Sequence, residues 1–125
     1  MKRLLVFLFA LALLGSCSQQ REYYFKFTVL TNQSNLKLIQ LIGGSGLCQF
    51  SDTSGVAVGS TCTTETYTTA KGANISAGGY PHGNSLLPNA TFDWEAEFYV
   101  NGNLEETRTG TQGLANYGYV NFIVP

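Results

Sequence analysis

The sequence contains little charge, a single histidine and no long apolar run, and each shortage argues against a class of function. Charged residues make up 12% of the 125 residues, and seven basic against eight acidic side chains give a formal net charge of −1. Nucleic-acid-binding domains usually carry a basic stripe, so we expect no nucleic-acid partner. One histidine and the absence of a Gly-x-Ser-x-Gly motif argue against a hydrolase of the serine type.

The longest uninterrupted apolar run is Leu4–Leu14, which follows two basic residues, Lys2 and Arg3. As a helix this run would be about 16 Å long, too short for a hydrocarbon core of roughly 30 Å. A basic start, an apolar centre and small residues before a cleavage site are typical of a secretory signal peptide. The alternatives are an ordinary cleaved signal peptide, which leaves no lipid, and a tethered helix.

The segment Leu14-Gly15-Ser16-Cys17 closes this run and resembles the lipobox of bacterial lipoproteins. The resemblance implies that residues 1–16 are removed as a signal peptide and that Cys17 receives a lipid. Residues 17–22 would then be the lipidated cysteine and its tether, and residues 23–125 a folded domain. We therefore expect a protein anchored by lipid to the extracytoplasmic side of a membrane in the bacterial cell envelope, the outer membrane in a Gram-negative cell.

Two further cysteines, Cys48 and Cys62, remain once Cys17 is assigned to the lipid. In an exported domain such a pair most simply forms a disulfide, worth roughly 3 kcal/mol for a loop of about fifteen residues. A zinc site would need four ligands, and His82 is the only histidine available to join the pair. We expect no metal and no other cofactor.

Alternating apolar and polar residues, interrupted by turn residues, predict β-strands along the rest of the chain. The predicted strands cover residues 23–29, 36–42, 47–50, 61–69, 73–77, 92–100, 103–109 and 117–124. We predict an all-β fold, an antiparallel immunoglobulin-like β-sandwich of about seven strands, with a small barrel as the alternative. Trp94 is the predicted core anchor, packed with other aromatic residues of the strands: Phe25, Phe27, Phe98 and Phe122.

The clearest predicted element is a hairpin around Asn101-Gly102, a dipeptide that suits a type I′ turn. A two-residue turn pairs residues whose numbers add to 203, which places Glu95 opposite Arg108 as an ion pair. The same register places Glu97 opposite Glu106, which is unfavourable. A bulged loop would shift the register, so both pairings stay open.

Tyrosines and one irregular stretch are the candidates for recognition. Residues 78–89 form the longest irregular stretch and contain Tyr80 and His82, while Tyr99 and Tyr117 are predicted on strands. Exposed tyrosines can stack on sugars or anchor a partner protein.

Three carboxylates, Asp93, Glu95 and Glu97, share one face of a predicted strand. A calcium site or a glycosidase pair is possible in principle, but such ligands usually come from a tight loop or from different elements. A solvated strand face is the preferred interpretation, and we expect no enzyme.

Residues 67–77 (YTTAKGANISA) and 98–110 (FYVNGNLEETRTG) resemble segments of the MmpS family, the small mycobacterial membrane proteins. The resemblance implies an immunoglobulin-like extracytoplasmic domain that serves as an accessory to a lipid-exporting transporter. The chain differs from that family in having a lipobox where MmpS proteins have a membrane helix.

Together these features predict a non-catalytic lipoprotein that binds an envelope component. The alternative is a glycan- or small-ligand-binding module that uses exposed tyrosines, and an enzyme based on Glu95 and Glu97 is the least favoured interpretation.

Overall fold

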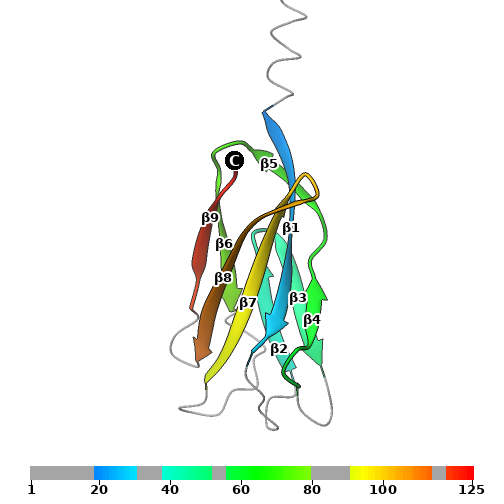
Figure 1. Ribbon diagram of the computed structural model, residues 1–125, viewed down its shortest axis with the longest axis vertical. Coiled ribbons are helices and arrows are strands. Elements are labelled where there is room, and N and C mark those ends of the chain that lie inside the picture. The colour runs from blue at the N-terminus through cyan, green and yellow to red at the C-terminus, as the bar shows by residue number, and fades with distance from the viewer. Residues whose placement is uncertain (1–18, 31–37, 52–55, 80–90, 114–117) are drawn as a thin grey trace, which may run out of the picture.

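The computed structural model describes residues 19–30, 38–51, 56–79, 91–113 and 118–125, and these form two antiparallel β-sheets (Figure 1). The nine strands are β1 (Gln20–Val29), β2 (Leu38–Gly43), β3 (Gly46–Ser51), β4 (Thr61–Thr63), β5 (Tyr67–Ala70), β6 (Asn74–Gly79), β7 (Thr91–Val100), β8 (Asn103–Gly113) and β9 (Val120–Ile123). The prediction of an all-β, two-sheet antiparallel fold is confirmed. The strands number nine instead of about seven.

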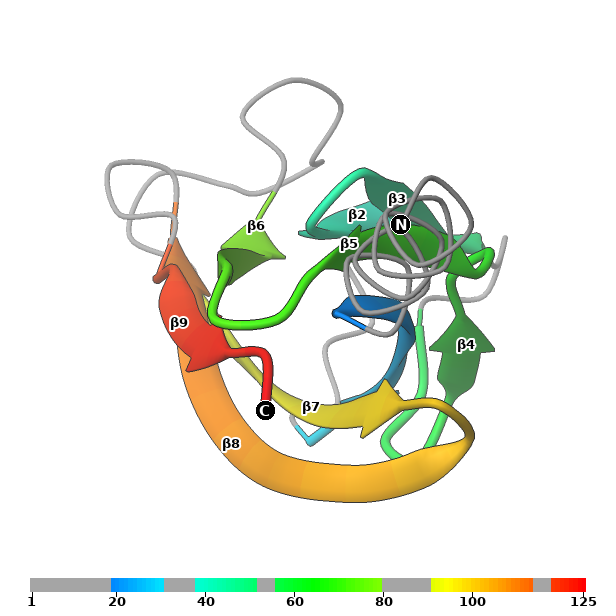
Figure 2. The ribbon, with the colours of Figure 1, turned by 90° about the horizontal axis from the view of Figure 1, so that it is seen from above.

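One sheet is built around β1. Its strand order is β4-β1-β7-β8. Both β5 and β4 pair with the side of β1 that does not contact β7: β5 pairs with the first half of β1 and β4 with the second half. The second sheet has the order β3-β2-β6-β9. Figure 2 shows β7 and β8 curving around one side of the molecule, with β2, β3 and β6 on the opposite side.

Thr64 explains one of the additional strands. The sequence predicts a single strand over residues 61–69, but the structure divides it into β4 and β5. Thr64 lies between them, buried, where its hydroxyl accepts a hydrogen bond from the Phe25 amide at 3.0 Å and its own amide donates to the Phe25 carbonyl at 2.9 Å. Because the side chain takes a place in the ladder, regular pairing with β1 is interrupted there.

The core lies between the sheets and is dominated by aromatic rings. Alternation along β1 and β7 buries one face of each strand, including Trp94, whose side chain has no exposed surface. Its ring lies 5.8 Å from that of Phe27, edge to face. Phe25, Phe98 and Phe122 form a second group with ring centroids 4.9–5.2 Å apart. These distances are those of favourable aromatic pairs, so the predicted core is confirmed.

The disulfide between Cys48 and Cys62 is confirmed, with 5.9 Å between the two Cα atoms. Cys48 belongs to β3 in the four-stranded sheet and Cys62 to β4 in the five-stranded sheet. The covalent link therefore joins an edge strand of one sheet to an edge strand of the other.

The β7–β8 hairpin has the predicted two-residue turn. Asn101 and Gly102 have φ angles of 49° and 81°, as a type I′ turn requires, and Tyr99 pairs with Leu104 in the expected register. A bulge between Phe98 and Tyr99 then moves every later pair by one residue.

The bulge overturns the predicted pairing of Glu95 with Arg108. Glu95 lies opposite Thr109, and Glu97 opposite Thr107. Arg108 lies opposite Ala96 and forms its ion pair with Glu106 of the same strand, at 2.6 Å. One extra residue in β8 separates the two glutamates that the unbulged register would have brought into repulsive contact, Glu97 and Glu106.

The two ends of the sandwich differ in what they carry. Strand β1 begins at one end, beside the C-terminus, and we call this the N-terminal end (Figure 1). Strands β1, β3, β6 and β8 all finish at the other end, which we call the distal end.

Candidate functional site: the outer face of the five-stranded sheet

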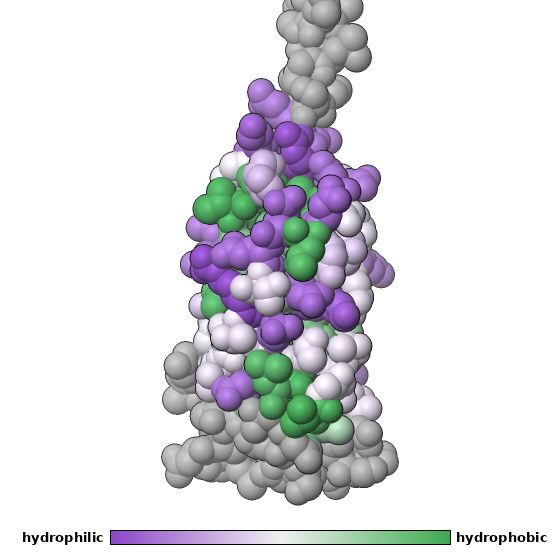
Figure 3. Space-filling view, viewed as in Figure 1, coloured by the Kyte–Doolittle hydropathy of each residue, from purple (hydrophilic) through white to green (hydrophobic). Residues whose placement is uncertain are grey.

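The outer face of the five-stranded sheet is covered with polar side chains from its three longest strands. They alternate with the core residues of the same strands: Tyr24, Lys26 and Thr28 of β1, Asp93, Glu95, Glu97 and Tyr99 of β7, and Thr107, Thr109 and Thr111 of β8. Figure 3 shows this face as mostly hydrophilic, with one hydrophobic group near the distal end and others nearer the N-terminal end.

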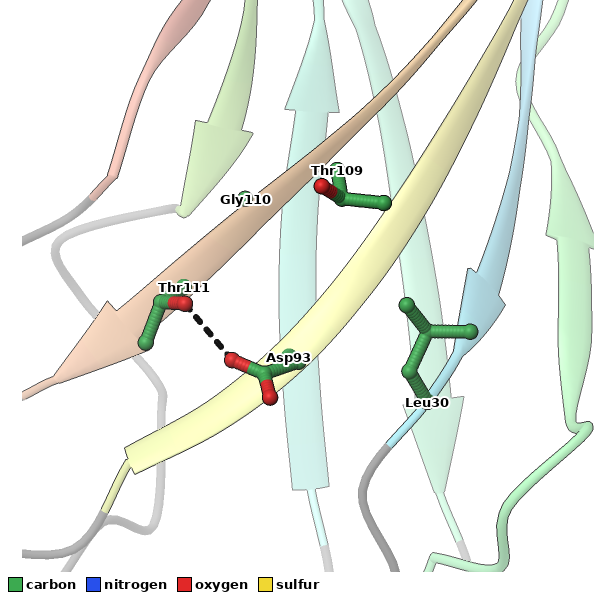
Figure 4. A pocket seen from close by; sticks show the side chains of 5 residues that line it. All are labelled: Leu30, Asp93, Thr109, Gly110 and Thr111. Carbon is green, nitrogen blue, oxygen red and sulfur yellow. Dashed lines mark hydrogen bonds between the residues drawn. The ribbon is translucent and has the colours of Figure 1, made fainter.

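A shallow hollow of about 300 Å³ lies on this face at the distal end. It is lined by Leu30, Asp93 and the segment Thr109–Thr111 (Figure 4). Leu30 directly follows β1, Asp93 lies near the start of β7, and Thr109–Thr111 lie toward the end of β8. These three strands are far apart in the sequence but adjacent in the sheet. The hollow therefore exists only because β1 and β8 flank β7.

The lining of the hollow combines one carboxylate, two hydroxyls and one aliphatic side chain. Thr111 donates a hydrogen bond from its hydroxyl to Asp93 Oδ1 at 2.6 Å, which ties β8 to β7 (Figure 4). Leu30 is 41% exposed, and it follows Val29, whose carbonyl accepts a hydrogen bond from the Gly59 amide at 2.8 Å. Hydrogen-bonding groups beside apolar surface suit a neutral, hydroxyl-rich ligand.

The second feature of the face is a pair of tyrosines nearer the N-terminal end. Tyr24 and Tyr99 are cross-strand partners, and their rings stack with centroids 4.6 Å apart and planes inclined by 7°. Tyr99 donates its hydroxyl to Glu97 Oε2 at 2.7 Å. This hydrogen bond, with desolvation and the negative charge of Glu97, raises the pKa of the Tyr99 phenol above its ordinary value of 10.0.

The Glu97→Gln variant should lower the pKa of Tyr99 toward its ordinary value. The raised pKa means that the neutral phenol is favoured in the folded protein. Its contribution to stability is therefore complete below pH 10 and is lost as the pH rises through the higher, folded-state pKa. Absorbance titration at alkaline pH, compared with a Tyr99→Phe variant to assign the transition, measures the shift. Identical Tyr99 transitions in wild type and Glu97→Gln would contradict it.

The structure describes one of the four residues predicted for recognition. Tyr99 lies on the outer face as a half-buried member of the stacked pair. Tyr80, His82 and Tyr117 lie outside the described residues, as does Cys17. The strands that precede these residues, β6 for Tyr80 and His82 and β8 for Tyr117, both finish at the distal end where the hollow lies.

Sequence reasoning did not identify the hollow. Asp93 was predicted only as part of an acidic strand face, and Leu30, Thr109 and Thr111 were not singled out. The available signal was the alternating threonines of residues 107–111, which predict hydroxyls on one strand face but not what lies beside them.

Among the described residues, no group of three histidine, cysteine or carboxylate side chains is placed so that it could hold a metal ion. No helix within the described ranges is long and apolar enough to cross a membrane.

No protein-family model, no curated protein and no solved structure matches this chain.

Proposed function

We propose that the protein is a lipid-anchored lipoprotein of the bacterial envelope that binds another envelope component without catalysis. The supporting observation is the course of β1. The strand starts at Gln20, three residues after Cys17, and finishes at Val29, next to the hollow. A strand of ten residues is about 33 Å long, so a lipid on Cys17 would hold the hollow roughly that far from the membrane.

This arrangement gives the two ends of the sandwich separate roles. The N-terminal end is tied to the start of β1, where the Lys71 amide donates to the Gln19 carbonyl at 2.8 Å and Arg21 contacts the Pro125 carbonyl at 3.2 Å. The distal end carries the hollow and the strand ends that lead into residues 80–90 and 114–117. A partner would therefore meet the distal end first, as the resemblance to a transport accessory also suggests.

Replacement of Cys17 tests the anchor. The Cys17→Ala variant should move from the membrane fraction to the soluble fraction and lose the mass of the acyl chains, because two or three chains provide nearly all the membrane affinity. Ser18→Ala is the matched control and should stay with membranes. Membrane fractionation with mass spectrometry of the intact protein provides both readouts. Retention of Cys17→Ala on membranes at wild-type levels would refute the anchor.

A second candidate function is recognition of a neutral glycan in the hollow. The observation that favours it is the lining: Asp93 and Thr109 offer acceptors and a donor for sugar hydroxyls, and Leu30 offers an apolar surface.

The Asp93→Asn and Thr109→Val variants test this second function. If the hollow binds a neutral glycan, each variant should weaken binding about tenfold, which is the effect of losing one good hydrogen bond. Thr107→Val is the control, because Thr107 lies on the same strand face but outside the hollow. Binding is measured on a glycan array and then by calorimetry with the strongest hit. Equal losses in all three variants, or no glycan bound by the wild type, would exclude the hollow as a glycan site.

A further inference from the structure

The outer face of the four-stranded sheet carries no charged side chain among the residues that the structure describes. Its described residues are Gln40 and Ile42 of β2, Leu47, Gln49 and Ser51 of β3, Asn74, Ser76 and Gly78 of β6, and Asn121 and Ile123 of β9, with Tyr119 just before that strand. The opposite outer face, on the five-stranded sheet, carries Lys26, Asp93, Glu95 and Glu97. The two faces of one small domain therefore differ sharply in charge.

The polar groups of the uncharged face are largely paired with one another. Gln40 donates its side-chain amide to Gln49 at 3.0 Å, and Ser76 donates its hydroxyl to Asn121 at 2.7 Å. Both pairs join neighbouring strands on the face itself. Covering this face would therefore cost less desolvation than covering polar groups bonded only to water.

Apolar side chains of the same face are strongly exposed. Leu47 is 51% exposed, Ile123 62% and Tyr119 45%. Ile42 lies between Leu47 and Gly78 in the sheet, and the Tyr119 ring covers Gly78 so closely that a Cβ there would lie 2.7 Å from it. Leu47, Ile42 and Tyr119 thus form an apolar row across the sheet. Few charges, exposed apolar groups and a tyrosine are the composition of a protein–protein interface.

We infer that this uncharged face packs against the same face of a second copy of the chain. Two copies of the charged face would bring their carboxylates together, whereas two copies of the uncharged face meet without repulsion. The position of the proposed lipid anchors is compatible with this dimer. Stacked sheets related by a two-fold axis along the strands keep both N-terminal ends on the same side, where two lipid anchors can enter one membrane.

The size of the face sets the strength of the dimer. Four strands about 4.8 Å apart, three of them six residues long and β9 four residues long, give a face of at most roughly 19 by 20 Å. This footprint is about half of the roughly 800 Å² per partner that standard interfaces bury, so the dimer is weak in solution. Confinement on a membrane raises the effective concentration, and this part of the inference rests on the proposed lipid anchor.

Site-specific photo-crosslinking of the full chain on vesicles tests the inference. A benzophenone amino acid at position 123 should give a covalent dimer on vesicles of phosphatidylethanolamine and phosphatidylglycerol, while the same probe at position 104 should not. Adding Leu47→Glu should reduce the dimer at least tenfold, because it places two like charges in the interface. Leu104→Glu is the matched control: Leu104 is 52% exposed, as Leu47 is 51%, but belongs to the other sheet.

The outcomes distinguish a failure of the proposed dimer from a failure of the proposed lipid anchor. Flotation of the vesicles shows whether the protein is membrane-bound. If it floats and the probe at position 123 gives no dimer, the inference is wrong and the anchor stands. If it does not float, sedimentation equilibrium at concentrations up to about 1 mM should still show a dimer that Leu47→Glu abolishes and Leu104→Glu does not. A monomer throughout, or a crosslink in native membranes only to a different protein or a glycan, overturns the inference.

Discussion

Removal of the disulfide by the double substitution Cys48→Ala and Cys62→Ala is expected to destabilise the domain by about 3 kcal/mol and to lower its Tm by about 10–15 °C. The bond closes a loop with a sequence separation of 14 residues, and its loss lets the unfolded chain regain that loop entropy. Loss of a covalent link in the folded state adds to this destabilisation. Strand β4 has only three residues, and the disulfide fixes it to β3 across the two sheets.

Thermal and urea unfolding with and without reductant measure this effect. Reduced wild-type protein should unfold close to the double variant, and the variant should not respond to reductant. Thr63→Ala, an exposed neighbour in the same short strand, is the control and should change stability by less than about 0.5 kcal/mol. A double variant within about 1 kcal/mol of wild type would show that the sheets hold β4 without the covalent link.

The Gly110→Ala variant is expected to be destabilised by about 3 kcal/mol, the upper part of the range for overpacking a core. A Cβ on Gly110 would lie 2.2 Å from Trp94 Cζ2, well inside van der Waals contact. Trp94 has no room to retreat, because its side chain is fully buried and its ring packs edge to face against Phe27. One of the two strands must therefore move, and the register pair Trp94–Gly110 would open.

Intrinsic fluorescence follows this change directly, since Trp94 is the only tryptophan in the chain. The emission of Gly110→Ala should shift to longer wavelength if the ring becomes hydrated, alongside a lower midpoint in urea. Thr109→Ala alters the adjacent, exposed residue of the same strand and should leave both values near wild type. Wild-type stability in Gly110→Ala would mean that the sheet relaxes around the added methyl group at little cost.

Buried polar atoms near this position show how tightly the distal half of the core is packed. Gln112 is fully buried, and a Cβ on Gly79 would overlap its side-chain amide, so the amide lies directly on the backbone of β6. Neither amide atom of Gln112 has a hydrogen-bond partner, nor does Trp94 Nε1. Gly79 and Gly110 thus make room for two large side chains of β7 and β8 that reach into the space between the sheets.

The candidate site was predictable only in part. Tyr99 was expected on a strand face, and the structure places it there with Tyr24 as its stacking partner. The hollow was not predictable, because Leu30, Asp93 and Thr109 lie on or directly after three strands whose neighbour relations are not encoded in any local pattern. A period of two tells which residues share a face of one strand, but not which strand lies next to it.

Local patterns in the sequence by themselves determined the all-β fold, the two faces of β1 and β7, the type I′ turn and the partner of Cys48. Each follows from a simple rule applied along the chain: alternation, positive φ at Asn101 and Gly102, or the pairing of the two cysteines that lie beyond the N-terminal apolar segment. Only the tertiary structure decided the strand order, the bulge at Phe98 and Tyr99, and the division of charge between the two outer faces. These depend on pairings between residues far apart in the chain, and such pairings are selected by how the whole core packs rather than by any one segment.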